Sequence, residues 1–170
     1  MKLIESKTLV SAQASIEFTS IPGTYTDLVV LVSLRASSTG PWAGLELNGS
    51  TSNFTRRALE GTGSSVSSTS RTDGLNAIVQ NPSDSTANTF SNSSIYIPNY
   101  TASTAKSISI DTISENNATA VVQAITAFLW NNTAAITSLT IRAQVGNLVA
   151  GSIISLYGVL KGSDGIVTTS

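Results

Sequence analysis

The stretch Ala105-Lys106-Ser107-Ile108-Ser109-Ile110-Asp111-Thr112-Ile113 alternates isoleucine with hydroxyl-bearing or charged side chains. Successive side chains of a β-strand point to opposite faces of a sheet, so this spacing predicts a strand with one apolar and one wet face. The same alternation of Ser and Thr with Val, Ile and Leu recurs through most of the chain. Ser and Thr together make up roughly three residues in ten, well above ordinary usage. The pattern therefore predicts a protein built from β-sheets with one solvated face.

Comparable runs lie on both sides of this stretch. The strongest is Asp27 to Ala36, whose segment 28–32 is apolar on both faces and is therefore predicted to be a central strand. Clusters of Gly, Pro, Asn, Asp and Ser separate the runs. Short strands at this spacing predict an all-β protein, an antiparallel, jelly-roll-like β-sandwich with residues 1–170 in a single domain. The further strands are expected in residues 3–10, 15–19, 44–48, 54–59, 89–97, 136–145 and 152–160.

Two segments allow more than one interpretation. Residues 119–130 have apolar side chains that fit helical spacing as well as alternation, and we expect a strand because β-branched residues are common there. A helix is the alternative. Residues 61–72 are a Ser/Thr/Gly stretch with one apolar residue, Val66, and are expected to form a long surface loop. The alternative is that they become ordered against a neighbouring subunit.

The chain has no histidine and no cysteine. It therefore lacks the side chains that most often transfer protons, attack carbonyls or bind transition metals at neutral pH. The best local group for calcium consists of Asp111, Glu115, Asn116 and Asn117, and it is too sparse to predict a site. We expect no enzyme activity and no catalytic, cofactor-binding or metal-binding residues.

Charged residues make up 11% of the chain, and the net charge is −1. Since the nine basic residues are scattered, with only Arg56 and Arg57 adjacent, we expect no nucleic-acid partner. No apolar run approaches the ~20 residues that span a bilayer, so we expect no membrane partner. The N-terminus has no continuous apolar region, so we expect no signal peptide and synthesis in the cytoplasm. Such weak charge favours association with other proteins.

Several residues are candidates for contact with a partner. Trp42 follows Gly40-Pro41, which interrupts the predicted strands, and Tyr96 and Tyr100 flank a predicted strand end. Residues 1–10 are interpreted as a partner-contacting arm or an edge strand, which could add to a partner's sheet. The candidate contacts are Trp42, Arg56, Arg57, Tyr96, Tyr100, Leu3 and Ile4.

Four motifs, in order along the chain, resemble segments of the small jelly-roll structural proteins of tailed bacteriophages. Phe18-Thr19-Ser20-Ile21-Pro22-Gly23-Thr24-Tyr25-Thr26-Asp27-Leu28 resembles their "F-x-x-I-P-x-T-Y-x-x-L" opening. Asn48-Gly49-Ser50-Thr51-Ser52-Asn53-Phe54 is similar to an "N-G-D/S-…-N-Y/F" segment. Leu129-Trp130-Asn131-Asn132-Thr133-Ala134-Ala135-Ile136-Thr137-Ser138-Leu139 resembles "L-W-x-x-T-x-A-I-x-S-I". Ser155-Leu156-Tyr157-Gly158-Val159 resembles the closing "x-L-Y-G-I/V".

This resemblance implies a virion protein in one of two settings. The first is a capsid decoration (cement) protein, a homotrimer on the capsid surface that binds and stabilises the shell of the major capsid protein. The second is a tail-fibre or receptor-binding module that recognises host surface glycans through Trp42, Tyr96 or Tyr100. Because the sequence contains no long fibrous shaft, coiled-coil heptads or collagen-like repeats, we expect the free-standing decoration protein.

Overall fold

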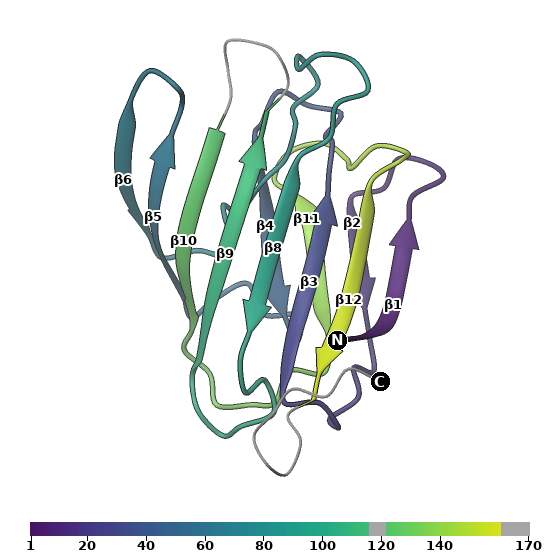
Figure 1. Ribbon diagram of the computed structural model, residues 1–170, viewed down its shortest axis with the longest axis vertical. Helices are drawn as coiled ribbons and strands as arrows, with labels where there is room; N and C mark the ends of the chain where they lie inside the picture. Colours follow the sequence, from purple (N-terminus) through teal and green to yellow (C-terminus); the bar gives the residue numbers. More distant parts are fainter. Residues whose placement is uncertain (116–121, 161–170) are drawn as a thin grey trace.

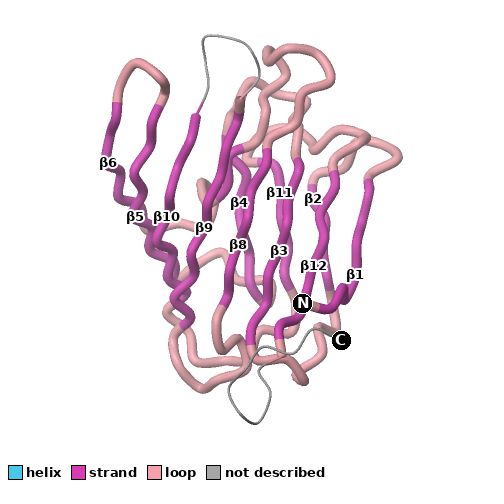
Figure 2. Tube along the Cα trace, viewed as in Figure 1, coloured by secondary structure: helices cyan, strands magenta, loops and turns pink. Residues whose placement is uncertain are grey.

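The computed structural model describes residues 1–115 and 122–160, and within them the regular elements are all β-strands (Figure 2). The prediction of an all-β protein is confirmed. The strands are β1 (Lys2–Thr8), β2 (Ser15–Phe18), β3 (Asp27–Ser33), β4 (Trp42–Leu47), β5 (Phe54–Gly61), β6 (Val66–Arg71), β7 (Ile78–Val79), β8 (Asn92–Ile97), β9 (Lys106–Ser114), β10 (Val122–Trp130), β11 (Leu139–Ala143) and β12 (Ile153–Val159).

The strands form two antiparallel sheets that pack face to face as a sandwich (Figure 1). The larger sheet has eight strands in the order β1-β12-β3-β8-β9-β10-β5-β6. The smaller sheet has four strands in the order β2-β11-β4-β7. As predicted, the strand that contains residues 28–32 is central, since β3 lies between β12 and β8.

The pairing of the strands is nested. β1 pairs with β12, β2 with β11, β3 with β8, and β4 with β7. A long hairpin rolled into two four-stranded sheets produces this arrangement, which is the jelly roll. The two strand pairs β5–β6 and β9–β10 are insertions in that scheme. They extend the larger sheet by four strands, whereas the smaller sheet keeps its four.

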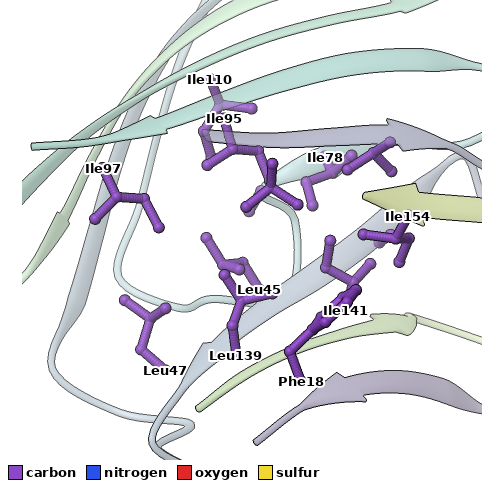
Figure 3. Close-up of a cluster of buried hydrophobic side chains, with 14 of the residues drawn as sticks. Phe18, Leu45, Leu47, Ile78, Ile95, Ile97, Ile110, Leu139, Ile141 and Ile154 are labelled. Carbon is purple, nitrogen blue, oxygen red and sulfur yellow. The ribbon is translucent and has the colours of Figure 1, made fainter. Parts of the chain in front are cut away.

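The core lies between the two sheets and consists of the alternate, inward-facing side chains of each strand (Figure 3). In β3, Leu28 and Val30 are completely buried. The smaller sheet contributes residues such as Leu45 and Ile141, and the larger sheet contributes residues such as Ile95 and Ile110 (Figure 3). Burial of these apolar side chains is the main stabilising contribution to the sandwich.

Several hydroxyl groups are also buried, near the C-terminal end of β9. Thr112 Oγ1 accepts a 3.0 Å hydrogen bond from the backbone N–H of Val79 and shares a 2.6 Å hydrogen bond with Ser93 Oγ. Ser114 Oγ donates a 2.6 Å hydrogen bond to Oδ1 of Asn81. Buried polar groups need such partners. Part of the Ser and Thr content therefore stabilises the interior rather than solvating the surface.

Both segments with alternative interpretations contain strands. Residues 122–130 form β10, so the strand prediction is confirmed for them, while 119–121 lie outside the described residues. Residues 61–72, expected to be a loop, instead contain the end of β5, a turn and β6. The turn includes Gly63 with a φ of 83°, and β6 pairs residue by residue with β5. The pairing with β5 makes residues 66–71 a strand. The sequence did not predict this strand because the segment contains too few apolar residues to show alternation.

Candidate interaction surface

The outer face of the larger sheet, the face turned away from the smaller sheet, presents its side chains in rows that cross all eight strands. Three of the predicted contacts, Leu3, Tyr96 and Arg57, lie in one such row, although they come from β1, β8 and β5. The structure thus brings these three residues to a single face. The row reads Leu3, Tyr157, Val29, Tyr96, Ser109, Ala127, Arg57, Ser70.

The neighbouring row combines hydroxyl groups and one carboxylate, Asp111, with exposed apolar side chains. Ile125 and Leu59 are directly opposite each other on β10 and β5 and are 62% and 59% exposed. Leu31 of the central strand β3 is 40% exposed. The row reads Ser6, Ser155, Leu31, Ser94, Asp111, Ile125, Leu59, Ser68.

We define the apolar patch as Leu59, Val66, Ile113 and Ile125, which lie on β5, β6, β9 and β10. Val66 is 81% exposed and is the diagonal neighbour of Leu59 across the β5–β6 ladder. Shallow hollows of about 160 and 330 Å³ lie on either side of Ile125, one lined by Leu59 and Val66 and the other by Tyr96. Contiguous groups of exposed apolar side chains commonly mark interaction sites, so the apolar patch is a candidate for one.

The outer face of the smaller sheet has a different character. Glu17, Thr140 and Glu46 form a row across β2, β11 and β4. Arg142 Nη1 lies 3.0 Å from Oε1 of Glu46, in an exposed ion pair. Charged side chains of this kind favour water, so this face is suited to solvent and the outer face of the larger sheet is the better candidate for a partner.

Tyr96 is held in place on the outer face by a buried carboxylate. Its hydroxyl donates a 2.7 Å hydrogen bond to Oδ2 of Asp27, which is completely buried. The backbone N–H of Asn99 donates a 2.9 Å hydrogen bond to Oδ1 of the same carboxylate. The hydrogen bond to Asp27 raises the pKa of Tyr96 above its ordinary value, and burial acts in the same direction. The ring is thus fixed with one side toward solvent.

Trp42 and Arg56, two further predicted contacts, lie against each other. The guanidinium carbon of Arg56 is 4.5 Å from the centre of the half-buried Trp42 ring, a cation–π arrangement. Arg56 is 1% exposed and donates a 2.7 Å hydrogen bond to Glu60 Oε1 and a 3.2 Å hydrogen bond to Thr69 Oγ1. Arg56 therefore does not form part of the exposed surface, whereas its neighbour Arg57 does.

Tyr100 and Ile4 also point into the molecule. Tyr100 is completely buried, and its hydroxyl donates a hydrogen bond to the backbone carbonyl of Pro22. In the edge strand β1 the register shifts between Leu3 and Glu5, and Ile4 packs against the core while Leu3 remains exposed. A β-bulge of this kind turns one extra side chain to the other face.

The sequence interpretation did not identify Leu31, Leu59, Ile113 or Ile125 as surface residues. A usable signal was present, because each lies one position out of phase with the inward-facing residues of its own strand. In β9 the inward series continues from Ile108 and Ile110 to Thr112 and Ser114, which leaves Ile113 on the outer face. When the apolar residues of one strand move from its inward-facing to its outward-facing positions, as in β9, the outer face is a candidate for contact as well as the inner one.

Among the described residues, no three acidic side chains come close enough together to hold a metal ion. Asn116 and Asn117 of the calcium alternative lie outside the described residues. The described part of the chain contains no helix that could cross a membrane. Comparison of the chain with protein-family models, with curated proteins and with solved structures yields no match.

Proposed function

We propose that this chain is a structural protein of a tailed-bacteriophage virion, a capsid decoration protein that binds the assembled shell of the major capsid protein through the outer face of its larger sheet. Its role is structural rather than catalytic. Two lines of observation support the proposal. One is the series of four sequence motifs, and the other is the contrast between the two outer faces of the sandwich.

The observation that carries the proposal is the apolar patch beside Tyr96 on a broad sheet face. Burial of apolar surface contributes roughly 25 cal/mol per Å², so side chains such as Leu59 and Ile125 supply binding energy when a partner covers them. The hydroxyl groups of Ser94 and Ser109 in the same two rows can donate and accept hydrogen bonds across the interface. They do so without the desolvation penalty that buried charges incur.

Such a surface explains how a decoration protein stabilises a shell. A protein that binds only the assembled shell shifts the equilibrium toward that shell by mass action. The outer face is suited to a wide, shallow contact, since its exposed apolar groups are spread over four strands rather than gathered in a deep cavity. Repetition over the shell multiplies modest contacts into strong retention.

The test compares two double variants on shells assembled from the major capsid protein of the same virus. Leu59→Asp with Ile125→Asp places two charges in the apolar patch. Ser15→Asp with Thr140→Asp places two charges on the outer face of the smaller sheet. We expect the first variant to lose shell occupancy at least tenfold and the second to bind like the unaltered chain, with both retaining the β-type circular dichroism spectrum. Equal occupancy by all three proteins would contradict the proposal.

The receptor-binding alternative makes a separate prediction. Sugars stack on open aromatic faces, yet Tyr100 is buried and Trp42 is covered on one side by Arg56. Tyr96 is the candidate ring that remains exposed on the sheet. Binding of the chain to host glycans on an array, lost in Tyr96→Ala and accompanied by no binding to shells, would replace the decoration role with receptor recognition.

A further inference from the structure

The two edges of the larger sheet are β1 and β6, and they differ in how well they are protected. Figure 1 shows them at opposite ends of the sheet. β1 contains Lys2, Glu5 and Lys7 and has a bulge after Leu3. Charged side chains and bulges are the devices by which sheet edges avoid pairing with other chains.

β6 has neither of these devices along its length. It reads Val66-Ser67-Ser68-Thr69-Ser70-Arg71, so that its one charged side chain is at the end. It pairs with β5 in unbroken register, and within the described residues β5 is its only neighbouring strand. The backbone N–H and C=O groups along its far side are therefore available to another strand.

We propose that β6 of one copy of this chain pairs antiparallel with β6 of a second copy, so that two larger sheets join into one. A two-fold axis perpendicular to the sheet relates the copies and keeps the two outer faces on the same side. Residues directly opposite each other in an antiparallel pair point to the same face of the sheet. Since side chains alternate faces along β6, the two-fold axis must pass beside a residue that is opposite its own copy, and not between two residues. The two central registers have Ser68 opposite Ser68, or Thr69 opposite Thr69.

The side chains of β6 are complementary to themselves in both registers. With Ser68 at the centre, Ser67 is opposite Thr69, and Val66 is opposite Ser70. With Thr69 at the centre, Ser68 is opposite Ser70. Hydroxyl pairs across an antiparallel ladder stabilise it, whereas like charges directly opposite each other destabilise it. Neither register places Arg71 opposite Arg71, so the seam contains no directly opposed charges.

In the proposed dimer, the exposed apolar groups beside this edge lie next to the seam on both copies. Val66 of β6 and Leu59 of β5 are both on the outer face, next to the proposed seam. Joining the sheets brings the apolar patches of the two copies to the same side of one continuous surface. This symmetric contact is self-complementary, as a two-fold interface requires.

The test measures the mass of the purified full chain by sedimentation velocity between about 1 µM and 1 mM, the range in which weak self-association is detected. We expect a species of twice the 17.6 kDa mass of the chain. Ser68→Lys with Ser70→Lys places like charges opposite each other in both registers. We expect this variant to raise the dimer dissociation constant about tenfold or more. Ser6→Lys with Thr8→Lys adds the same charge to β1 and is expected to leave the dimer unchanged.

A charge-reversed pair of variants separates loss of pairing from loss of folding. Ser68→Glu with Ser70→Glu is expected to be monomeric alone, and to form a mixed dimer when combined with the lysine variant. A chain that remains monomeric, a closed trimer such as the phage resemblance implies, or a dimer that the lysine variant leaves intact would overturn the proposal. So would binding of an extended segment of another protein to β6 in place of the second copy.

Discussion

The hydroxyl of Tyr96 donates a 2.7 Å hydrogen bond to Oδ2 of Asp27, and through this bond an exposed aromatic ring of the outer face is attached to a buried carboxylate. Asp27 is the first residue of β3, and Tyr96 is on β8, which pairs with β3. The bond thus fixes the ring at the centre of the proposed binding face. It also gives the Asp27 carboxylate, which is buried in the folded chain, a hydrogen-bond donor.

Removing the hydroxyl should therefore reduce stability. In Tyr96→Phe the Asp27 carboxylate loses a donor, and we expect a loss of about 1 kcal/mol, since hydrogen bonds to charged groups contribute at least this much. For a chain of this length that corresponds to a decrease in Tm of roughly 2–4 °C. Thermal unfolding followed by circular dichroism measures it. Tyr157→Phe, which removes a hydroxyl from the same row, is the matched control, and an equal decrease there would show that Asp27 is not the cause.

The same bond predicts a pH dependence. The hydrogen bond to Asp27, together with burial, raises the pKa of Tyr96 above 10.0, so the folded chain holds the phenolic proton more tightly than the unfolded chain. This contribution to stability is fully present below the unfolded pKa of about 10 and is lost as the pH rises through the folded pKa. Urea unfolding of the unaltered chain and of Tyr96→Phe should therefore differ at pH 8 and converge at strongly alkaline pH. A difference that stays constant across this range would contradict the assignment.

Gly158 of β12 is in direct contact with the ring of Tyr25. A Cβ at this position would lie 2.3 Å from Cγ of Tyr25, closer than two carbon atoms can approach. We expect Gly158→Ala to destabilise the fold by about 1–3 kcal/mol, the range found for overpacked cores. The measurement is the free energy of unfolding in urea.

Removing the ring provides the control for this prediction. In a Tyr25→Ala background the added methyl group has room, so Gly158→Ala should cost much less there than in the unaltered chain. If the two substitutions were additive, the clash with Tyr25 would not be the reason for the glycine.

The course of the chain was largely predictable because alternation is a local property. The runs at 15–19, 27–36 and 152–160 were expected as strands, and β2, β3 and β12 lie within them. β6 and β7 were not expected. β6 is a polar strand that depends on β5 for its structure, and β7 has only two residues, so neither produces a periodic signal.

The surface was less predictable than the fold, because exposure depends on what covers each face. Tyr100 and Tyr96 are four residues apart and have the same chemistry, yet the first is in the core and the second is on the outer face. Leu31 lies within an apolar segment that indicates coverage of both faces, but among the described residues a second sheet covers only one side. The out-of-phase residues Leu59 and Ile125 become a patch only through the pairing of β5 with β10.

The ion pair between Arg56 and Glu60 leads to a further prediction, that Glu60 is the partner that stabilises the buried charge of Arg56. The Arg56 side chain is inaccessible to solvent, and its Nη2 lies 2.7 Å from Oε1 of Glu60, whose side chain is 15% exposed. Glu60→Ala leaves the guanidinium buried without its carboxylate, and we expect a loss of about 3 kcal/mol.

Replacing both partners should be less harmful than removing one, because Arg56→Met with Glu60→Ala leaves an apolar side chain of similar length against Trp42. We expect this double variant to be more stable in urea than Glu60→Ala alone. Since Thr69 Oγ1 of β6 also donates a 2.7 Å hydrogen bond to Glu60, amide exchange in β6 should accelerate in both variants. A double variant less stable than Glu60→Ala would mean that Trp42 and Thr69, rather than the ion pair, account for the burial of Arg56.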